Sequence, residues 1–182
     1  GDATIQYPFV SVQVLIIHGT VITWDKSDRL IEDGGLRITG DLITAVGRST
    51  ELLESYPGED MLHANGMLIM PGLIDTHTHT DRILFRGAPM GHEKPRPGDQ
   101  DVSLDYEALR YATLAHCIEA LRNGVTTLFH AQTTAETIPL SLDAVAEPIS
   151  QAGLRAMICF QVSDRAGLSQ ARQAVEENAR FA

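Results

Sequence analysis

Two histidines separated by one residue, His77 and His79, are the side chains of this sequence whose spacing is best suited to chemistry. They directly follow Leu73-Ile74-Asp75, a short run that favours a strand. On a strand, residues i and i+2 project to the same side, so both imidazoles can reach one metal ion. Imidazole is a common ligand of Zn²⁺ and Fe²⁺. The context therefore predicts one divalent metal ion at this pair, although a bare His-x-His spacing is weak evidence.

The residues before the pair form short strands according to their pattern. Four stretches rich in β-branched and apolar residues are found at residues 12–24, 34–47, 61–64 and 67–70. The first is interrupted at His18-Gly19-Thr20, which indicates either one kinked strand or two. Asn65-Gly66 favours a type I′ hairpin turn between the last two. We expect residues 1–70 to form a compact group of antiparallel strands, with one short helix near 49–55.

The pattern changes at Pro71-Gly72, after which strands alternate with helices. Strands are predicted at Leu73–Asp75, Val125–Phe129 and Leu154–Val162, and helices before Asn123-Gly124, over about 138–151 and from Ser169 onward. This alternation indicates an α/β fold with parallel strands. About three strand–helix units are too few to close an eight-stranded barrel, which takes about 250 residues. We therefore interpret 71–182 as the N-terminal part of such a barrel, with an open sheet edge that favours aggregation.

The first of these helices follows a long irregular stretch, residues 87–102, for which a functional role is more common than an idle one. Ser103 or Asp101 is the expected cap of the helix. Its expected buried face consists of apolar residues near helical spacing, namely Leu104, Leu114, Ile118 and Leu121.

Composition narrows the class of partner. The 14 basic and 24 acidic residues leave a net charge of −10, which argues against nucleic acid as partner. The two cysteines, Cys117 and Cys159, form no disulfide framework, so we expect a cytoplasmic protein in which both are small core residues. No apolar run reaches the roughly 18 residues that cross a membrane.

Residues 67–79 (MLIMPGLIDTHTH) resemble the signature that opens the barrel of amidohydrolase-superfamily enzymes. The strands upstream resemble the small β-sandwich that precedes that barrel. Phe85-Arg86-Gly87 and residues 153–182 are similar to SsnA-like aminohydrolases, in the deaminase and chlorohydrolase branch. The resemblance implies a β-sandwich segment at 1–70, a partial (β/α)8 TIM barrel at 71–182, and a metal-dependent hydrolase acting on C–N bonds of a small, heterocyclic substrate.

The resemblance also implies a mononuclear site, in which a third histidine and an aspartate from later strands join His77 and His79. The metal, Zn²⁺ or Fe²⁺, would activate water for attack on a C–N or C–Cl carbon. Those later residues are not in this sequence, so no catalytic residue is assigned and we expect the 182 residues alone to be inactive. Two alternatives stay open. One is a binuclear amidase or hydantoinase-like member, which needs a bridging lysine that neither Lys26 nor Lys94 offers. The other is a half-chain or scaffold that needs a partner polypeptide or further copies of itself.

Other polar residues lie near the ends of the predicted strands. His130 ends the second barrel strand and either contacts substrate, supports the metal ligands, or makes a structural hydrogen bond; Gln132 has the same options. Arg86 either binds a substrate carboxylate or phosphate through its planar guanidinium group or ties down its own loop. His92 is a weaker candidate for substrate contact, and His116 is expected to be structural.

Overall fold

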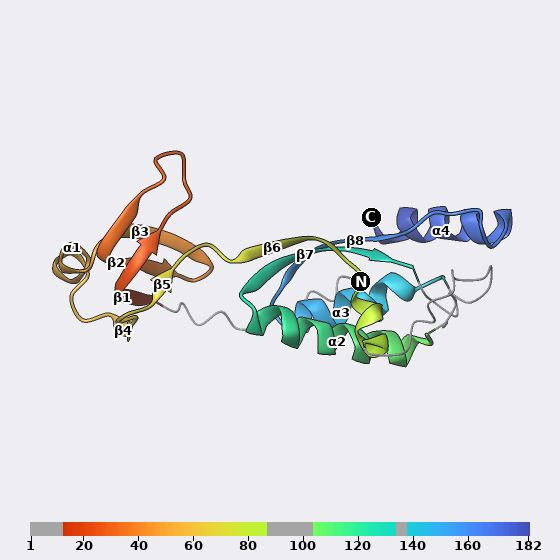
Figure 1. Cartoon of the computed structure of the whole chain (residues 1–182), viewed down its shortest axis with the longest axis horizontal. Coiled ribbons are helices and arrows are strands. Elements are labelled where there is room, and N and C mark those ends of the chain that lie inside the picture. Colours follow the sequence, from red (N-terminus) through yellow and green to blue (C-terminus); the bar gives the residue numbers. More distant parts are fainter. Residues whose placement is uncertain (1–12, 87–103, 134–137) are drawn as a thin grey trace. The chain divides into compact units, whose positions relative to one another are not determined.

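The computed structural model describes residues 13–86, 104–133 and 138–182. The chain divides into two compact units, Gly1–Pro71 and Gly72–Ala182. In Figure 1 the first unit runs from red to yellow and the second from yellow to blue. Within the described ranges, no helix is both long and apolar enough to cross a membrane.

The first unit contains one five-stranded sheet with the order β3-β2-β1-β4, in which β5 also pairs with β1. Its elements are β1 (Gln13–Ile22), β2 (Leu30–Thr39), β3 (Leu42–Arg48), α1 (Ser49–Ser55), β4 (Asp60–His63) and β5 (Leu68–Ile69). Leu15 and Ile17 of β1 are fully buried and pack with Leu52 of α1, which places the expected short helix over the sheet. The second sheet that a sandwich requires is not among the described residues of this unit.

The first strand is a single kinked strand. Its pairing with β2 shifts register between Ile16 and Gly19, and His18 lies between them with a φ of 63°. A non-glycine residue with positive φ is uncommon and marks a local distortion, here a β-bulge. Of the two interpretations of residues 12–24, the kinked strand is therefore the one observed.

The hairpin predicted at Asn65-Gly66 is wrong. Strands β4 and β5 do not pair with each other but both pair parallel with β1. The Met67 amide donates to the Ala64 carbonyl oxygen at 2.9 Å, and only Gly66 of the two central residues has a positive φ, 73°. A type I′ turn needs positive φ at both positions, whereas positive φ at the second alone is the type II pattern. The chain turns there and continues along β1.

The second unit has a mixed α/β fold with a three-stranded parallel sheet in the order β6-β7-β8, as expected. Its elements are β6 (Leu73–Thr78), the 3₁₀ helix η1 (Thr80–Phe85), α2 (Tyr106–Arg122), β7 (Val125–Gln132), α3 (Ser141–Gln151), β8 (Arg155–Phe160) and α4 (Leu168–Phe181). Figure 1 shows α2 and α3 on the same side of this sheet. The side chains of β7 alternate accordingly: Leu128 is fully buried against the helices, whereas Phe129 remains 37% exposed on the other side.

We call these two sides the helix-covered face and the open face. On the helix-covered face, Leu128 packs with residues of α2 and α3, namely Cys117, Ala120, Val145 and Ile149. On the open face, Ile74 and Met157 lie beside the same strand and are 59% and 64% exposed. Cys159 follows Met157 by two residues and is exposed, so its expected place in a core is wrong for the described structure.

The buried face of α2 is not the one predicted. Leu114, Ile118 and Leu121 are between 38% and 53% exposed, and only Leu104, just before the helix, is buried. The buried residues of α2 are the smaller set Leu109, Ala112, Thr113, Cys117 and Ala120. Four of these five side chains are small and allow close approach of the helix to its neighbours. Close packing therefore buries this face and leaves Leu114, Ile118 and Leu121 exposed. The expected caps, Ser103 and Asp101, lie outside the described residues.

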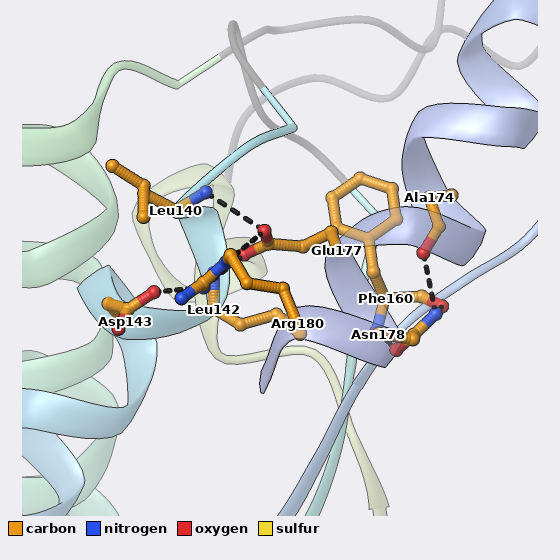
Figure 2. Close-up of polar contacts among 8 residues, drawn as sticks. All are labelled: Leu140, Leu142, Asp143, Phe160, Ala174, Glu177, Asn178 and Arg180. Atoms are coloured by element: carbon orange, nitrogen blue, oxygen red, sulfur yellow. Dashed lines mark hydrogen bonds and ion pairs between the residues drawn. The ribbon is translucent and has the colours of Figure 1, made fainter. Parts of the chain in front are cut away.

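The observed cap of α2 is Asp105, whose carboxylate accepts a hydrogen bond from the Ala108 amide at 2.7 Å. By contrast, the N-cap residue of α3 is Leu140, which has a φ of 68° and supplies no capping side chain. The carboxylate of Glu177 on α4 takes that role from 37 residues away. It accepts hydrogen bonds from the amides of Leu140 and Leu142 at 3.0 and 3.1 Å (Figure 2).

Two further side chains fasten α4. Arg180 donates to both oxygens of Glu177 and also pairs with Asp143 of α3. Asn178 donates to the Phe160 carbonyl and accepts from the Phe160 amide, each at 2.8 Å, so it satisfies both backbone groups at the end of β8 (Figure 2). Helix α4 is therefore held to α3 and β8 by polar contacts as well as by Ala174 in the adjacent core.

Candidate metal centre

The predicted metal ligands lie where β6 ends and η1 begins. Thr78, between them, contacts His116 of α2 through its hydroxyl and so points to the helix-covered face. Because successive residues of an extended chain point to opposite sides, His77 and His79 project to the open face. Pairing with β7 is irregular between Asp75 and Thr78, where β6 contains one extra residue. Such a bulge redirects the side chains that follow it, which are those of the histidine pair.

The two imidazoles are neighbours. Their ring centroids are 4.9 Å apart and the rings are nearly perpendicular, at 89°. The Nδ1 atom of His79 lies 2.7 Å from the carbonyl oxygen of Ala131. A carbonyl oxygen only accepts, so Nδ1 carries a proton, and in the neutral ring the lone pair is on Nε2. This arrangement, in which one ring nitrogen donates to a backbone carbonyl, is the usual one for a metal-binding histidine.

The residue types and tautomer thus fit a divalent metal ion that binds imidazole. The described ranges hold no group of three or more His, Cys, Asp or Glu side chains that could form a metal site. A structural or catalytic zinc ion takes at least three protein ligands. His77 and His79 can therefore contribute part of a coordination sphere.

Other polar groups support the backbone of the pair. The Asp75 carboxylate accepts from the His77 amide at 3.2 Å, which stabilises the bulge, and Thr78 Oγ1 lies 3.2 Å from His116 Nε2. Burial lowers the pKa of His116 below its ordinary value, against the opposing charge of Asp75, so its ring is neutral near pH 7. The sequence offered no signal for this contact beyond a histidine within a helix.

His130 and Gln132 lie on the helix-covered face of β7 and are 2% and 0% exposed. The Thr80 amide donates to His130 Nδ1 at 3.1 Å, and His130 Nε2 lies 2.9 Å from Gln132 Oε1. Burial lowers the pKa of His130, despite the hydrogen bond to Gln132, which keeps the ring neutral. Both ring nitrogens of His130 therefore have hydrogen-bond partners within the chain, which is the structural role expected as one of its alternatives. Its contact with substrate stays a prediction.

Arg86 lies just after η1, with a side chain that is 72% exposed. Its guanidinium group pairs with Glu119 of α2 at 3.2 Å. In this position it ties the end of η1 to α2, and its role with substrate stays a prediction. His92 lies outside the described residues.

Two relatives are similar to most of this chain. The protein named 5-methylthioadenosine/S-adenosylhomocysteine deaminase 2 of Archaeoglobus fulgidus is 30% identical over 149 residues, which are 80% of this chain and 33% of that protein. The 5'-deoxyadenosine deaminase of Methanopyrus kandleri is 30% identical over 176 residues, which are 93% of this chain and 38% of that protein. The chain therefore spans little more than a third of the length of these relatives.

Solved structures share its fold. Atrazine chlorohydrolase from Arthrobacter aurescens TC1, complexed with zinc, superposes with a TM-score of 0.68 at 25% identity, covering 81% of this chain and 35% of that one. An amidohydrolase from an environmental sample of the Sargasso Sea has a TM-score of 0.64 at 22% identity, covering 90% of this chain and 38% of that one. At this identity the second comparison concerns the fold alone.

The sequence profile of the amidohydrolase family matches residues 68–182, a stretch that begins before β6 and includes both histidines. This match covers more than half of the chain and agrees with the relatives above. The chain belongs to the amidohydrolase family.

Proposed function

We propose that these residues belong to a metal-dependent hydrolase that breaks a C–N bond of a small heterocyclic compound, most simply an aminohydrolase. The observation that carries the proposal is the His77–His79 pair on the open face, in which His79 Nδ1 donates to the Ala131 carbonyl oxygen and Nε2 is left for a metal ion. The names of the relatives support the reaction class, because they are deaminases of adenine nucleosides.

In this proposal the three parallel strands are the opening strands of a (β/α)8 barrel. The exposed apolar residues of the open face, Ile74, Phe129 and Met157, support it, because a barrel fills its interior with such side chains. The histidine pair supports it further, because it lies at the carboxyl end of β6, the end at which barrels carry their active sites.

His77, His79 and Ala131 have separate roles in this proposal. His77 and His79 hold a divalent metal, Zn²⁺ or Fe²⁺, through imidazole nitrogens, and the Ala131 carbonyl keeps the proton of His79 on Nδ1. The chemistry that such a metal supplies when bound is activation of water for attack on carbon near neutral pH. Two imidazoles are fewer than the protein ligands that a catalytic zinc site uses, so we expect turnover to require ligands beyond the pair.

The test is zinc binding by the 182-residue chain, by elemental analysis after dialysis and by titration against a chromophoric chelator. Because two imidazoles are fewer than the ligands of a complete zinc site, we expect little zinc to remain after dialysis. In the titration we expect zinc uptake that is lost in the double variant His77→Ala, His79→Ala. The matched control is His63→Ala in the first unit, where His18 and His63 form another close pair of rings, stacked with centroids 5.6 Å apart. Equal zinc uptake by the chain and the double variant would overturn the proposal.

Activity is a second readout. We expect release of ammonia from 5′-deoxyadenosine and 5-methylthioadenosine only when further ligands complete the coordination sphere of the metal. In that complete protein, the double variant His77→Ala, His79→Ala should abolish the release. A variant without His77 and His79 that still released ammonia at the original rate would exclude these residues from the reaction.

A further inference from the structure

Strand β7 holds the metal-binding segment at two successive positions. The carbonyl oxygen of Ala131 accepts from the imidazole of His79 at 2.7 Å, and the imidazole of the preceding residue, His130, accepts from the amide of Thr80 at 3.1 Å. The partners are thus consecutive residues in both segments, His79 and Thr80 at the junction of β6 and η1, and His130 and Ala131 in β7. One contact orients the ring of His79, and the other holds the backbone immediately after it.

The hydrogen bonds of His130 determine its tautomer. An amide N–H can only donate, so Nδ1 of His130 must carry a lone pair. Gln132 Oε1, 2.9 Å from Nε2, can only accept, so Nε2 must carry the proton. The two requirements agree, and together they describe a neutral ring with its acceptor directed at Thr80.

Among the described residues, the His130 ring is the acceptor of the Thr80 amide. Thr80 and Gln132 are 0% exposed and His130 is 2% exposed, so water does not reach the Thr80 amide. The side chain of Thr80 is engaged separately, with Thr113 of α2 at 3.0 Å. Without the His130 ring, the amide would be left buried and unpaired, at a cost that favours displacement of the segment.

Displacement of Thr80 would carry His79 with it. The residues are neighbours, and the turn that begins η1 links them further, because the Arg82 amide donates to the His79 carbonyl at 3.0 Å. A shift of this turn would move the His79 ring relative to the Ala131 carbonyl, which sets its tautomer. The position of Thr80 and the direction of the His79 lone pair are therefore coupled.

We propose that His130 is a positioning residue. By accepting the hydrogen bond of the Thr80 amide, it orients the His79 imidazole for metal binding. The inference rests on the proposed metal role of His79. It differs from a substrate contact by His130, which would require one of the two engaged ring nitrogens to be released. It also gives Gln132 a task, since its oxygen selects the tautomer of His130 that can accept.

The test compares His130→Asn with His130→Gln. Both variants place a carboxamide on β7, but the Asn oxygen lies at about the position of Nδ1 and can accept the Thr80 amide, whereas the Gln carboxamide extends to about the position of Nε2. We expect the dissociation constant of Zn²⁺ to rise about tenfold in His130→Gln, the low end of the effect of removing supporting contacts. His130→Asn should stay within about threefold of the original chain, because the acceptor is retained.

A second readout needs no metal. Nitrogen chemical shifts of the His79 ring should show the proton on Nδ1 in the original chain and in His130→Asn, and a mixture of tautomers in His130→Gln. Ile149→Ala is the control, because it removes buried apolar contacts of α3 with α2 and β7 and no hydrogen bond of Thr80 or His79. We expect it to lower stability while leaving the His79 tautomer and the zinc affinity unchanged.

The outcomes separate the two proposals. If His77→Ala, His79→Ala abolishes zinc binding but both His130 variants bind like the original chain, the positioning role is wrong and the metal role stands. If both His130 variants weaken binding equally, the acceptor is not the cause and the positioning role is again wrong. If the double variant binds zinc normally, the metal role fails, and the His79 tautomer alone then decides the positioning role. Should His130→Gln not fold by circular dichroism, Gln132→Met replaces it, with the expectation of mixed His79 tautomers.

Discussion

Replacing Glu177 with glutamine tests whether α3 is capped from outside its own sequence. The carboxylate of Glu177 is 1% exposed and accepts from two amides at the start of α3, those of Leu140 and Leu142, and from Arg180. Glutamine keeps the length of the side chain but has a single acceptor oxygen, and its NH₂ group would face a donor. The change therefore removes one buried acceptor and the negative charge together.

The magnitude follows from these contacts. A buried amide that loses its partner costs about 1–3 kcal/mol, and a helix cap is typically worth about 1 kcal/mol. The Arg180 side chain is 39% exposed, so its ion pair adds no more than about 1 kcal/mol, and Arg180 keeps Asp143 as a partner. We expect Glu177→Gln to lower the free energy of unfolding of the second unit by about 2–3 kcal/mol at pH 7.

The assay is urea unfolding followed by far-ultraviolet circular dichroism, because α3 and α4 contribute helical signal. Amide hydrogen exchange at Leu140 and Leu142 reports the cap itself, and we expect faster exchange in the variant. The control is Glu176→Gln, which makes the same change one residue earlier at an exposed position. It should alter stability by less than about 0.5 kcal/mol.

The effect should also depend on pH with a defined sign. Burial opposes ionisation of Glu177, but the hydrogen bonds from Arg180 and from the Leu140 and Leu142 amides outweigh it and lower its pKa. A carboxylate with a lowered folded-state pKa stabilises the fold fully above its unfolded pKa, about 4.3, and this contribution is lost as pH falls through the folded value. The difference between Glu177→Gln and the original chain should thus shrink below about pH 4.3. Equal stability of the Glu176 and Glu177 variants at pH 7, with unchanged exchange at Leu140, would refute the capping role.

Two other predictions concern Leu140 and the two cysteines. Leu140 is 53% exposed and has a φ of 68°, which strains a residue with a side chain. Leu140→Gly should therefore raise the free energy of unfolding by about 0.5–1 kcal/mol in the same urea assay. The control is Val175→Gly, at an exposed position within α4, which should lower the free energy of unfolding by up to about 1 kcal/mol. Burial raises the pKa of Cys117 to about 11, whereas Cys159 is exposed. A thiol reagent such as Ellman's reagent at pH 8 should therefore label one cysteine of the native chain rapidly and the second only in urea, and rapid labelling of both would contradict the packing of α2.

Local patterns were sufficient for the order of elements in the second unit. Three apolar strands separated by helical stretches predict parallel pairing, and β6, β7 and β8 pair in that way. The reason is geometric, because a strand followed by a helix returns to the sheet in the same direction. The position of His77 and His79 at the end of β6 was predictable on the same basis.

Periodicity alone could not select the buried face of α2. The spacing of Leu114, Ile118 and Leu121 shows that they share a face, and the spacing of Thr113, Cys117 and Ala120 shows the same for another. Which face is buried depends on the shape of what packs against it, here β7 and α3. The predicted antiparallel pairing of β4 with β5 was wrong for a related reason. A turn sequence does not reveal which strand has a free edge for pairing.

By itself, the sequence determined the α/β order of the second unit and the histidine pair with the strand that presents it, because these depend on residues close together in the chain. Only the tertiary structure decided what surrounds that pair. The contact of His130 with Thr80 spans 50 residues, that of His79 with Ala131 spans 52, and that of Glu177 with Leu140 spans 37. Such hydrogen bonds follow from strand register and helix packing, which no local spacing encodes.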